Sequence, residues 1–456
     1  MDKFFKLKEN GTNARTEILA GLTTFVTMAY IIFVNPNILT GKGAVATGMD
    51  WGAVFTATCI SAAIATFIMA LVANVPFAQA AGMGMNSFFV TLVTTSNFAG
   101  YKLTWQMALG VVFLCGLINL IITVTNIRRM LIRAVPGNLQ YAISAGIGLF
   151  IGFIGLRSAG IITGEQFNLV KLGDLSQPSV LMALTGIAII AILMLLRVKG
   201  AILLGMVIVT VLSLVLGLEK LPQGFSPISP IPSLMPALLK LDLKGLFTTM
   251  PVFSALALIL SFSLSDTFDT IGTFIGTGRK TGVFTDEDIN YSGKGMKTKL
   301  DKALFADATA TSVGALLGTS NVTTYIESAA GIAEGGKTGL TSFVVGIMFL
   351  VSLFLSPLVG LVPGYATAPA LIIVGVLMMS SVTKINFDDF GEALPAFFTI
   401  IMMPLTGSIA YGIASGFILF TFVKVVTGKY KDVHPMMYIF AVLFILNFVV
   451  GALNKV

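Results

Sequence analysis

Charged residues are scarce in this sequence. Asp, Glu, Lys and Arg make up 11% of its 456 residues, whereas soluble domains carry about 25%. Hydrophobic residue types account for 56%. So few charges cannot cover the surface of a water-soluble protein of this length. The composition therefore predicts a chain whose exterior faces lipid.

Cysteine and histidine are also rare. The two cysteines, Cys59 and Cys115, lie inside apolar stretches, which argues against a disulfide framework. His434 is the single histidine, so we expect neither a zinc site nor another metal or cofactor. The net charge of +7 comes from short basic clusters between apolar runs. Such clusters are typical of cytoplasmic loops and do not indicate a nucleic-acid partner.

Long apolar runs dominate the chain and predict an all-α polytopic membrane protein. A membrane helix needs about 20 mostly apolar residues. Two shorter, Gly-interrupted runs, 77–95 and 325–335, are expected to enter the membrane without crossing it as simple helices. With them the sequence predicts about 14 segments. The long runs are 18–36, 51–74, 104–126, 138–156, 179–197, 200–218, 250–275, 303–318, 340–362, 366–382, 394–426 and 435–453.

The loop charges predict the orientation of the chain. Basic residues follow alternate segments on the side of the basic N-terminus, which places both termini in the cytoplasm for an even segment count. A Pro-rich loop, 219–249, is then external and divides the chain near its midpoint. The basic residues are Arg128, Arg129, Arg133, Arg197, Lys199, Arg279, Lys280, Lys337 and Lys384.

The two halves of the chain share faint similarities. Residues 24–27 read Thr-Phe-Val-Thr and residues 267–270 read Thr-Phe-Asp-Thr, while Gly-rich breaks occur at 82–86 and 318–321. Seven segments in each half would invert the second half relative to the first. Short, Gly-interrupted segments at matching places in inverted halves indicate a transporter binding site.

Acidic residues inside apolar segments are costly, at about 2.5–3.5 kcal/mol each near a helix centre. Asp266 and Asp269 lie three residues apart, so they share one helix face. Two carboxylates so close do not both ionise readily, and we expect one of them to carry a proton. The structural alternative is a buried pair bonded to neighbouring Ser and Thr side chains.

Two further polar residues lie at the breaks of the short segments. Glu327 begins the second short segment, where a half-helix N-terminus could hold a polar ligand. The alternative is a capping box formed by Thr324 and Glu327. Asn86 offers a donor and an acceptor, as the edge of a heterocyclic base requires, although small-residue helix packing also explains its Gly-rich surroundings. Phe88, Phe268 and Tyr325 are candidates for stacking on a flat ring.

One sequence pattern argues for a different function. Residues 331–338, Gly-Ile-Ala-Glu-Gly-Gly-Lys-Thr, match the phosphate-binding pattern G-x-x-x-x-G-K-[ST]. That pattern works between a buried strand and a soluble helix, and neither is expected here. We interpret it as a flexible cytoplasmic turn and not as a nucleotide site.

The chain resembles the nucleobase:cation symporter-2 family, specifically its AzgA-like branch of adenine, guanine and hypoxanthine permeases. The resemblance spans nearly the whole chain in matching order and spacing. The matching stretches are residues 15–17, 23–30, 82–89, 266–272, 323–331 and 387–390 leading to Pro395.

The resemblance implies fourteen segments in two inverted seven-segment repeats. It implies a cytoplasmic N-terminus, 1–17, and a core domain built from 18–126 and 250–362. A gate domain, built from 138–218 and 366–453, would supply the contact of a homodimer. Short strands are expected at 78–82 and 320–324. In that family one acid in segment 8 and another in segment 10 bind the base.

These implications identify site residues in this sequence. Asp266, Glu327 and Asn86 are expected to bind the base, with Thr323, Thr324 and Phe268 beside them. Asp269 or Asp266 is expected to carry the coupling proton. The family pattern does not assign the two aspartates to one role each.

The resulting hypothesis is a cell-membrane permease that imports hypoxanthine, guanine or adenine by proton symport, with the core domain moving like an elevator against the gate domain. Its partners are the purine and the surrounding lipid. A sodium-coupled nucleobase or small-anion transporter of the same fold is the nearest alternative. A membrane-embedded enzyme is the remote one, because no histidine lies at membrane depth.

Overall fold

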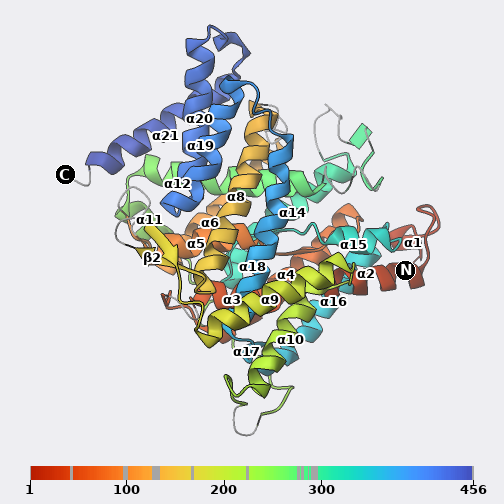
Figure 1. Cartoon of the computed structure of the whole chain (residues 1–456). Coiled ribbons are helices and arrows are strands. Elements are labelled where there is room, and N and C mark those ends of the chain that lie inside the picture. The colour runs from red at the N-terminus through yellow and green to blue at the C-terminus, as the bar shows by residue number, and fades with distance from the viewer. Residues whose placement is uncertain are drawn as a thin grey trace.

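The protein is largely helical (Figure 1). The computed structural model describes residues 2–41, 45–95, 101–125, 134–165, 169–221, 225–274, 278, 282–285, 287–288 and 296–453. Within these residues, nine helices are long and apolar enough to cross a membrane. Four shorter apolar helices accompany them, at Met83–Thr94, Ala201–Val215, Phe390–Thr406 and Pro435–Val449.

The elements follow one another along the chain in two runs. The first run contains α1 (Asp2–Phe5), α2 (Ala14–Met28), α3 (Ile31–Thr40), α4 (Trp51–Ile68), the π-helix η1 (Met69–Ala73), β1 (Gln79–Ala81), α5 (Met83–Thr94), α6 (Trp105–Val124), α8 (Gly137–Ser158), β2 (Ile162–Glu165), β3 (Leu169–Leu172), α9 (Pro178–Leu195) and α10 (Ala201–Val215). The second contains α11 (Leu243–Thr249), α12 (Val252–Thr273), α14 (Lys299–Leu317), β4 (Val322–Thr324), α15 (Ser328–Ala333), α16 (Gly339–Ser352), η3 (Leu353–Leu355), α17 (Ser356–Gly360), α18 (Gly364–Met379), η4 (Ser380–Lys384), α19 (Phe390–Thr406), α20 (Ile409–Val426), η5 (Tyr430–Asp432) and α21 (Pro435–Leu453).

Side-chain caps explain where several helices begin. The Asn13 side chain accepts a hydrogen bond from the backbone of Thr16 at 3.0 Å and starts α2. Asp50 starts α4 in the same way, and Thr298 with Asp301 forms a full capping box at α14. Each cap satisfies backbone N–H groups that the first helical turn leaves without partners. The polar residues between the apolar runs therefore set the helix boundaries.

The two strands β1 and β4 pair in antiparallel fashion although they lie far apart in the sequence. Gln79 faces Thr324 and Ala81 faces Val322. Both strands are buried and fall within the ranges 78–82 and 320–324. A short helix follows each strand, α5 after β1 and α15 after β4. Because the two strands are antiparallel, the N-termini of α5 and α15 lie at opposite ends of the buried β1–β4 ladder.

The helix packing repeats between the two halves. α16 packs on α2 and α4, while α6 packs on α12 and α14. α9 packs on α10 and α18, while α19 packs on α20 and α8. α10 also contacts α2, and α20 contacts α12. The first-half helices α2, α4, α9 and α10 correspond to the second-half helices α12, α14, α19 and α20, and α6 and α8 correspond to α16 and α18. Exchanging these counterparts converts each of the contacts named above into another of them. α21 has no counterpart in this scheme.

The apolar run 394–426 was expected to form one segment, but it forms the two helices α19 and α20. The break is at Gly407, whose φ of 63° is left-handed and ends α19. Glycine adopts this conformation at little cost, whereas a side chain would be strained there. Without a charge at the break, the hydropathy of the sequence does not reveal it.

Several of the loops used for orientation lie outside the described residues. These include Arg128, Arg129, Arg133, Arg279 and Lys280. Much of the hydrophilic stretch 279–302 lies outside them as well.

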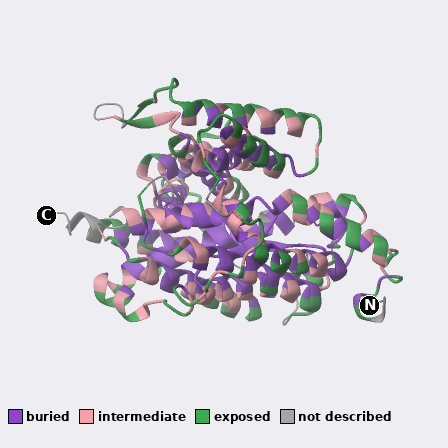
Figure 2. Cartoon of the chain, turned by 90° about the horizontal axis from the view of Figure 1, so that it is seen from below, coloured by how far each residue is buried: buried purple, intermediate pink, exposed green. Residues whose placement is uncertain are grey.

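Buried residues gather in the middle of the packed helices, and exposed residues occupy the periphery (Figure 2). Many exposed positions on the outer helices are apolar. Examples are Leu195 at 83% exposure and Val215 at 77%. An apolar exterior over a buried interior is what a lipid-facing protein requires.

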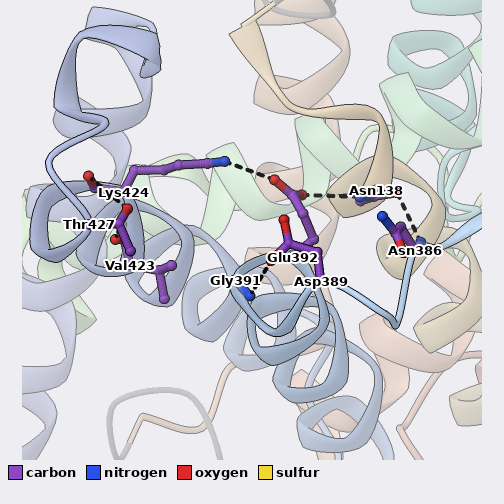
Figure 3. A network of polar contacts seen from close by, with 8 residues as sticks. All are labelled: Asn138, Asn386, Asp389, Gly391, Glu392, Val423, Lys424 and Thr427. Carbon is purple, nitrogen blue, oxygen red and sulfur yellow. Dashed lines mark hydrogen bonds and ion pairs between the residues drawn. The ribbon is translucent and has the colours of Figure 1, made fainter.

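Three helices of the predicted gate domain are tied together at one end (Figure 3). Lys424 of α20 lies 2.9 Å from a carboxylate oxygen of Glu392 in α19. The Asn138 side-chain amide of α8 donates to the other Glu392 oxygen at 3.1 Å. The Asn138 carbonyl in turn accepts from the backbone N–H of Asn386 at 3.3 Å. Because Lys424 and Glu392 are largely shielded from water, this pair holds α8, α19 and α20 in a fixed arrangement.

Candidate functional site

The predicted acids gather around the β1–β4 ladder. Asp266 and Asp269 come from α12, and Glu327 directly precedes α15. A fourth acid, Asp307 of α14, joins them. Asp269 lies within electrostatic reach of both Asp307 and Glu327. Three separate segments therefore bring carboxylates to one region at membrane depth.

Glu327 and Asp269 are only partly buried, in contrast to the other two acids. Glu327 is the N-cap residue of α15, and its side chain makes no capping bond. The capping box considered for Thr324 and Glu327 is therefore not formed. Instead, the Glu327 carboxylate accepts a hydrogen bond of 2.5 Å from the hydroxyl of Tyr30. Tyr30 lies at the break between α2 and α3, where the first membrane span loses its regular helix.

Asp266 is fully buried, and both of its carboxylate oxygens have partners. Asn321 donates to one oxygen at 2.9 Å and Asn119 donates to the other at 2.9 Å. The Thr311 hydroxyl approaches the second oxygen at 3.4 Å. Asn119 in turn accepts from the hydroxyl of Ser263. Asp266 thus joins α6, α12, α14 and the approach to β4.

Asp307 was not predicted from the sequence, yet it is the most connected acid of the group. One oxygen accepts from the backbone N–H of Thr324 at 3.1 Å, from its hydroxyl at 2.9 Å and from the Gln79 amide at 3.3 Å. The other accepts from Thr270 at 2.8 Å, and Thr270 shares a 3.0 Å contact with Thr323. Asp307 therefore ties both strands of the ladder to α12 and α14.

Asn86 is fully buried, and its side chain bonds to other protein groups. Its amide donates to the Asn35 side-chain carbonyl at 2.5 Å, and its own carbonyl accepts from the Ser320 hydroxyl. Asn35 also donates to Thr58 at 2.7 Å and to Thr319 at 2.9 Å. In this arrangement Asn86 holds α5 against α3 and against the turn that leads into β4.

The aromatic candidates lie at different depths in this packing. Phe88 is buried and stacks on Phe262 with ring centroids 4.5 Å apart. Phe268 belongs to the main hydrophobic core and is 5% exposed. The Tyr325 hydroxyl donates to the backbone carbonyl of Ala81 at 2.5 Å, and its ring lies 6.5 Å from that of Tyr30. Tyr30 therefore contacts Glu327 directly, and Tyr325 lies beside Tyr30.

Comparisons with known proteins agree with this architecture. A profile of the Permease family matches residues 15–415. The guanine/hypoxanthine permease PbuO of Bacillus subtilis is 43% identical over 97% of this chain and 99% of its own length. The adenine permease AdeP of Escherichia coli is 43% identical over 98% of this chain and 96% of its own length. The chain belongs to the nucleobase:cation symporter-2 family. This permease is thus a multi-pass membrane transporter and not an enzyme.

Solved structures share the fold of this permease. The transmembrane domain of the cyanobacterial bicarbonate transporter BicA matches with a TM-score of 0.63 at 18% identity, over 88% of this chain and 97% of that one. Murine Slc26a9, an anion transporter in the inward-facing state, matches with a TM-score of 0.60 at 12% identity, over 91% of this chain and 68% of that one. At these identities the likeness concerns the fold alone.

The chemistry of the site suits a neutral, polar ligand. Among the described residues, no group of three or more His, Cys, Asp and Glu side chains is arranged to hold a metal ion. The partly exposed carboxylates of Asp269 and Glu327 can accept N–H donors. The backbone N–H groups of Ser328, Ala329 and Ala330 at the start of α15 already donate to the carbonyls of Tyr325, Ile326 and Glu327.

Proposed function

We propose that this permease carries a purine base, hypoxanthine, guanine or adenine, across the cell membrane together with a proton. The observation that carries the proposal is the contrast among the four acids. Asp266 and Asp307 are fully buried and held by protein donors, whereas Asp269 and Glu327 are partly exposed. The names of PbuO and AdeP, as guanine/hypoxanthine and adenine permeases, support the substrate class.

Glu327 and Asp269 take the direct roles in this proposal. A purine presents ring N–H groups and ring nitrogens or a carbonyl along one edge. The Glu327 carboxylate accepts from the N–H groups of the purine edge. Asp269, beside Asp307 and Glu327, carries the coupling proton. Asp266 and Asn86, together with Thr323 and Thr324, position the strands and half-helices that hold the site.

Movement of the core domain against the gate domain changes the side that the site faces. The two domains approach each other closely at Gly84, in the first turn of α5. A Cβ atom at this position would lie 2.6 Å from Ile147 Cγ2 of α8. Because Gly84 has no side chain that could interlock with Ile147, this contact allows α5 to slide along α8. Each positive charge moved inward through 100 mV contributes about 2.3 kcal/mol to uptake.

The repeated packing supports two inverted halves of seven elements each. In this scheme α19 and α20 are the sixth and seventh elements of the second half, and α21 is an addition. Fourteen crossings that start in the cytoplasm return the chain there at residue 427. The cytoplasmic position of the C-terminus, the dimer through the gate domain and the coupling ion remain predictions.

Uptake of radiolabelled hypoxanthine, guanine and adenine tests the proposal, in cells that lack their own purine permeases. Glu327→Gln keeps the shape of the side chain but replaces one acceptor oxygen by a donor. A hydrogen bond to a charged group is worth about 1.5–3 kcal/mol, so uptake at low substrate should fall by roughly tenfold to 100-fold. Asp269→Asn should abolish the response to the proton gradient. The exposed Asp388→Asn serves as the matched control and should leave uptake unchanged.

Three results would argue against the proposal. Normal uptake by Glu327→Gln would remove the substrate role of the acid. Uptake that persists with an uncoupler but stops in sodium-free buffer would favour the sodium-coupled alternative. An absence of saturable uptake for all three purines in the wild-type protein would reject the substrate class.

A further inference from the structure

The stretch 331–338, which matches the phosphate-binding pattern, donates hydrogen bonds to a carboxylate of the same chain, that of Glu17. The carboxylate of Glu17, in the first turn of α2, accepts the backbone N–H of Lys337 at 2.9 Å, of Thr338 at 3.3 Å and of Thr341 at 3.2 Å. It also accepts the Thr341 hydroxyl at 2.6 Å. The stretch is therefore a packed turn and not the flexible one expected from the sequence.

Glu17 caps a helix that is more than 300 residues away in the sequence. Thr338 is the N-cap residue of α16, so the N–H groups of Thr338 and Thr341 belong to the first turn of that helix. Helix N-termini carry partial positive charge and attract carboxylates. Glu17 is 0% exposed. A buried carboxylate persists only when donors replace its hydration, and these four hydrogen bonds do so.

Glu17 contacts the turn between α15 and α16 and the start of α16, and α2 also packs along α15 itself (Figure 1). In the middle, Gly331 lies so close to α2 that a Cβ atom would come within 2.4 Å of the Ala20 carbonyl oxygen. At the other end, the Tyr30 hydroxyl donates to the Glu327 carboxylate at 2.5 Å. The two helices thus run side by side, with the Glu17 contact at one end and the Tyr30–Glu327 contact at the other.

We propose that Glu17 is a positioning residue: its carboxylate fixes α15 along α2 and thereby places the Tyr30 hydroxyl on the Glu327 carboxylate. The kinetic part of this proposal rests on the purine transport proposed above. Because α15 has only six residues, its own backbone bonds cannot hold it in place. The close contact at Gly331 prevents α15 from moving towards α2, and Glu17 prevents it from moving along or away from α2.

The kinetic test compares Glu17→Gln, Tyr30→Phe and the double variant in purine uptake. Glu17→Gln should raise the KM for hypoxanthine by roughly tenfold, with less than about a twofold change in Vmax per molecule in the membrane. The double variant should have the KM of Tyr30→Phe alone, because both changes act through the same contact. Glu9→Gln is the matched control, since Glu9 is exposed and pairs only with a neighbouring lysine.

An unchanged KM in Glu17→Gln, or a double variant in which the two KM effects multiply, would overturn the proposal. A purely structural role predicts fewer folded molecules with a normal KM. Thr341→Val keeps the carboxylate and removes one donor, so it serves if Glu17→Gln does not fold. Its KM should rise in the same direction, by roughly threefold.

A labelling experiment tests the position of α15 without any substrate. Thr24 is buried under Gly331, and both native cysteines are buried as well. A Thr24→Cys variant should therefore react slowly with N-ethylmaleimide. Adding Glu17→Gln should speed the reaction by roughly fivefold or more, whereas adding Glu9→Gln should not. Equal rates would overturn the positioning role, and a wild-type protein that transports no purine would overturn only the proposed function.

Discussion

Replacing Asp307 by asparagine should destabilise the permease strongly, because this carboxylate connects both strands of the ladder to α12 and α14. The substitution keeps the shape of the side chain and removes its charge. The asparagine amide must then occupy the place of one oxygen. If it takes the place that faces Thr324 and Gln79, it meets three donors. The amide should therefore face Thr270, which donates to the other oxygen.

The magnitude follows from that arrangement. The Thr270 hydroxyl can turn to donate to Thr323 instead, since the two hydroxyls lie 3.0 Å apart. The Thr270 oxygen can then accept one N–H of the new amide, so the main loss is that three charge-assisted bonds become neutral ones. A hydrogen bond to a charged group is worth about 1.5–3 kcal/mol and one between neutral groups about 0.5–1.5 kcal/mol. We therefore expect a loss of about 2–3 kcal/mol in the free energy of unfolding.

Unfolding of the purified protein by a sodium dodecyl sulfate titration in mixed micelles measures this loss. Asp388→Asn is the matched control, because surface substitutions usually change stability by less than about 0.5 kcal/mol. Asp307→Ala should cost more than Asp307→Asn, since it adds a cavity. An Asp307→Asn protein as stable as the wild type would refute the role assigned to this residue.

Two other perturbations test close contacts described above. Gly331→Ala should lower the free energy of unfolding by about 1–3 kcal/mol, because the added Cβ overpacks against α2. Gly164→Ala is the control, since nothing lies within 4 Å of its added Cβ. Equal free energies of unfolding for the two variants would contradict the close contact between Gly331 and α2. Lys199 in the loop before α10 pairs with Glu334 after α15. Joining the two positions in the double variant Lys199→Cys/Glu334→Cys with a bifunctional maleimide should lock the core domain to the gate domain and lower uptake by roughly tenfold or more. Normal uptake by the fully cross-linked protein would rule out relative movement at this contact.

The sequence revealed those acids that stand alone in apolar surroundings. Asp269 and Glu327 are unusual there because a charge at membrane depth is costly. Asp307 escaped notice because it follows Lys299, Asp301 and Lys302 within two turns of α14. Because these charged residues precede it, Asp307 resembles part of the polar start of a helix. Only the pairing of β1 with β4 shows that it lies at the centre of the site.

The partners of the acids could not be predicted for a different reason. Tyr30 and Asn119 lie in largely apolar stretches, and Asn321 is one of several polar residues in the run 319–324. Their roles depend on contacts between helices that are distant in the sequence, and no periodicity encodes such contacts. The same holds for Glu17, which belongs to the Arg-Thr-Glu stretch of the family resemblance but whose partner is the turn before α16.

The β1–β4 ladder has a consequence for how this protein is made. Two backbone groups of this ladder have their partners in the second half of the chain: the Gly82 N–H donates to the Asn321 carbonyl, and the Ala78 carbonyl accepts from the Tyr325 N–H. Until the ribosome has delivered the second half, those groups have no acceptor or donor in a medium that offers no water. A chain halted at the midpoint should therefore be a substrate for membrane proteases. Co-expression of the two halves as separate polypeptides should protect the first half from degradation. The hydrogen bonds of the ladder would then distinguish a completely synthesised chain from an incomplete one.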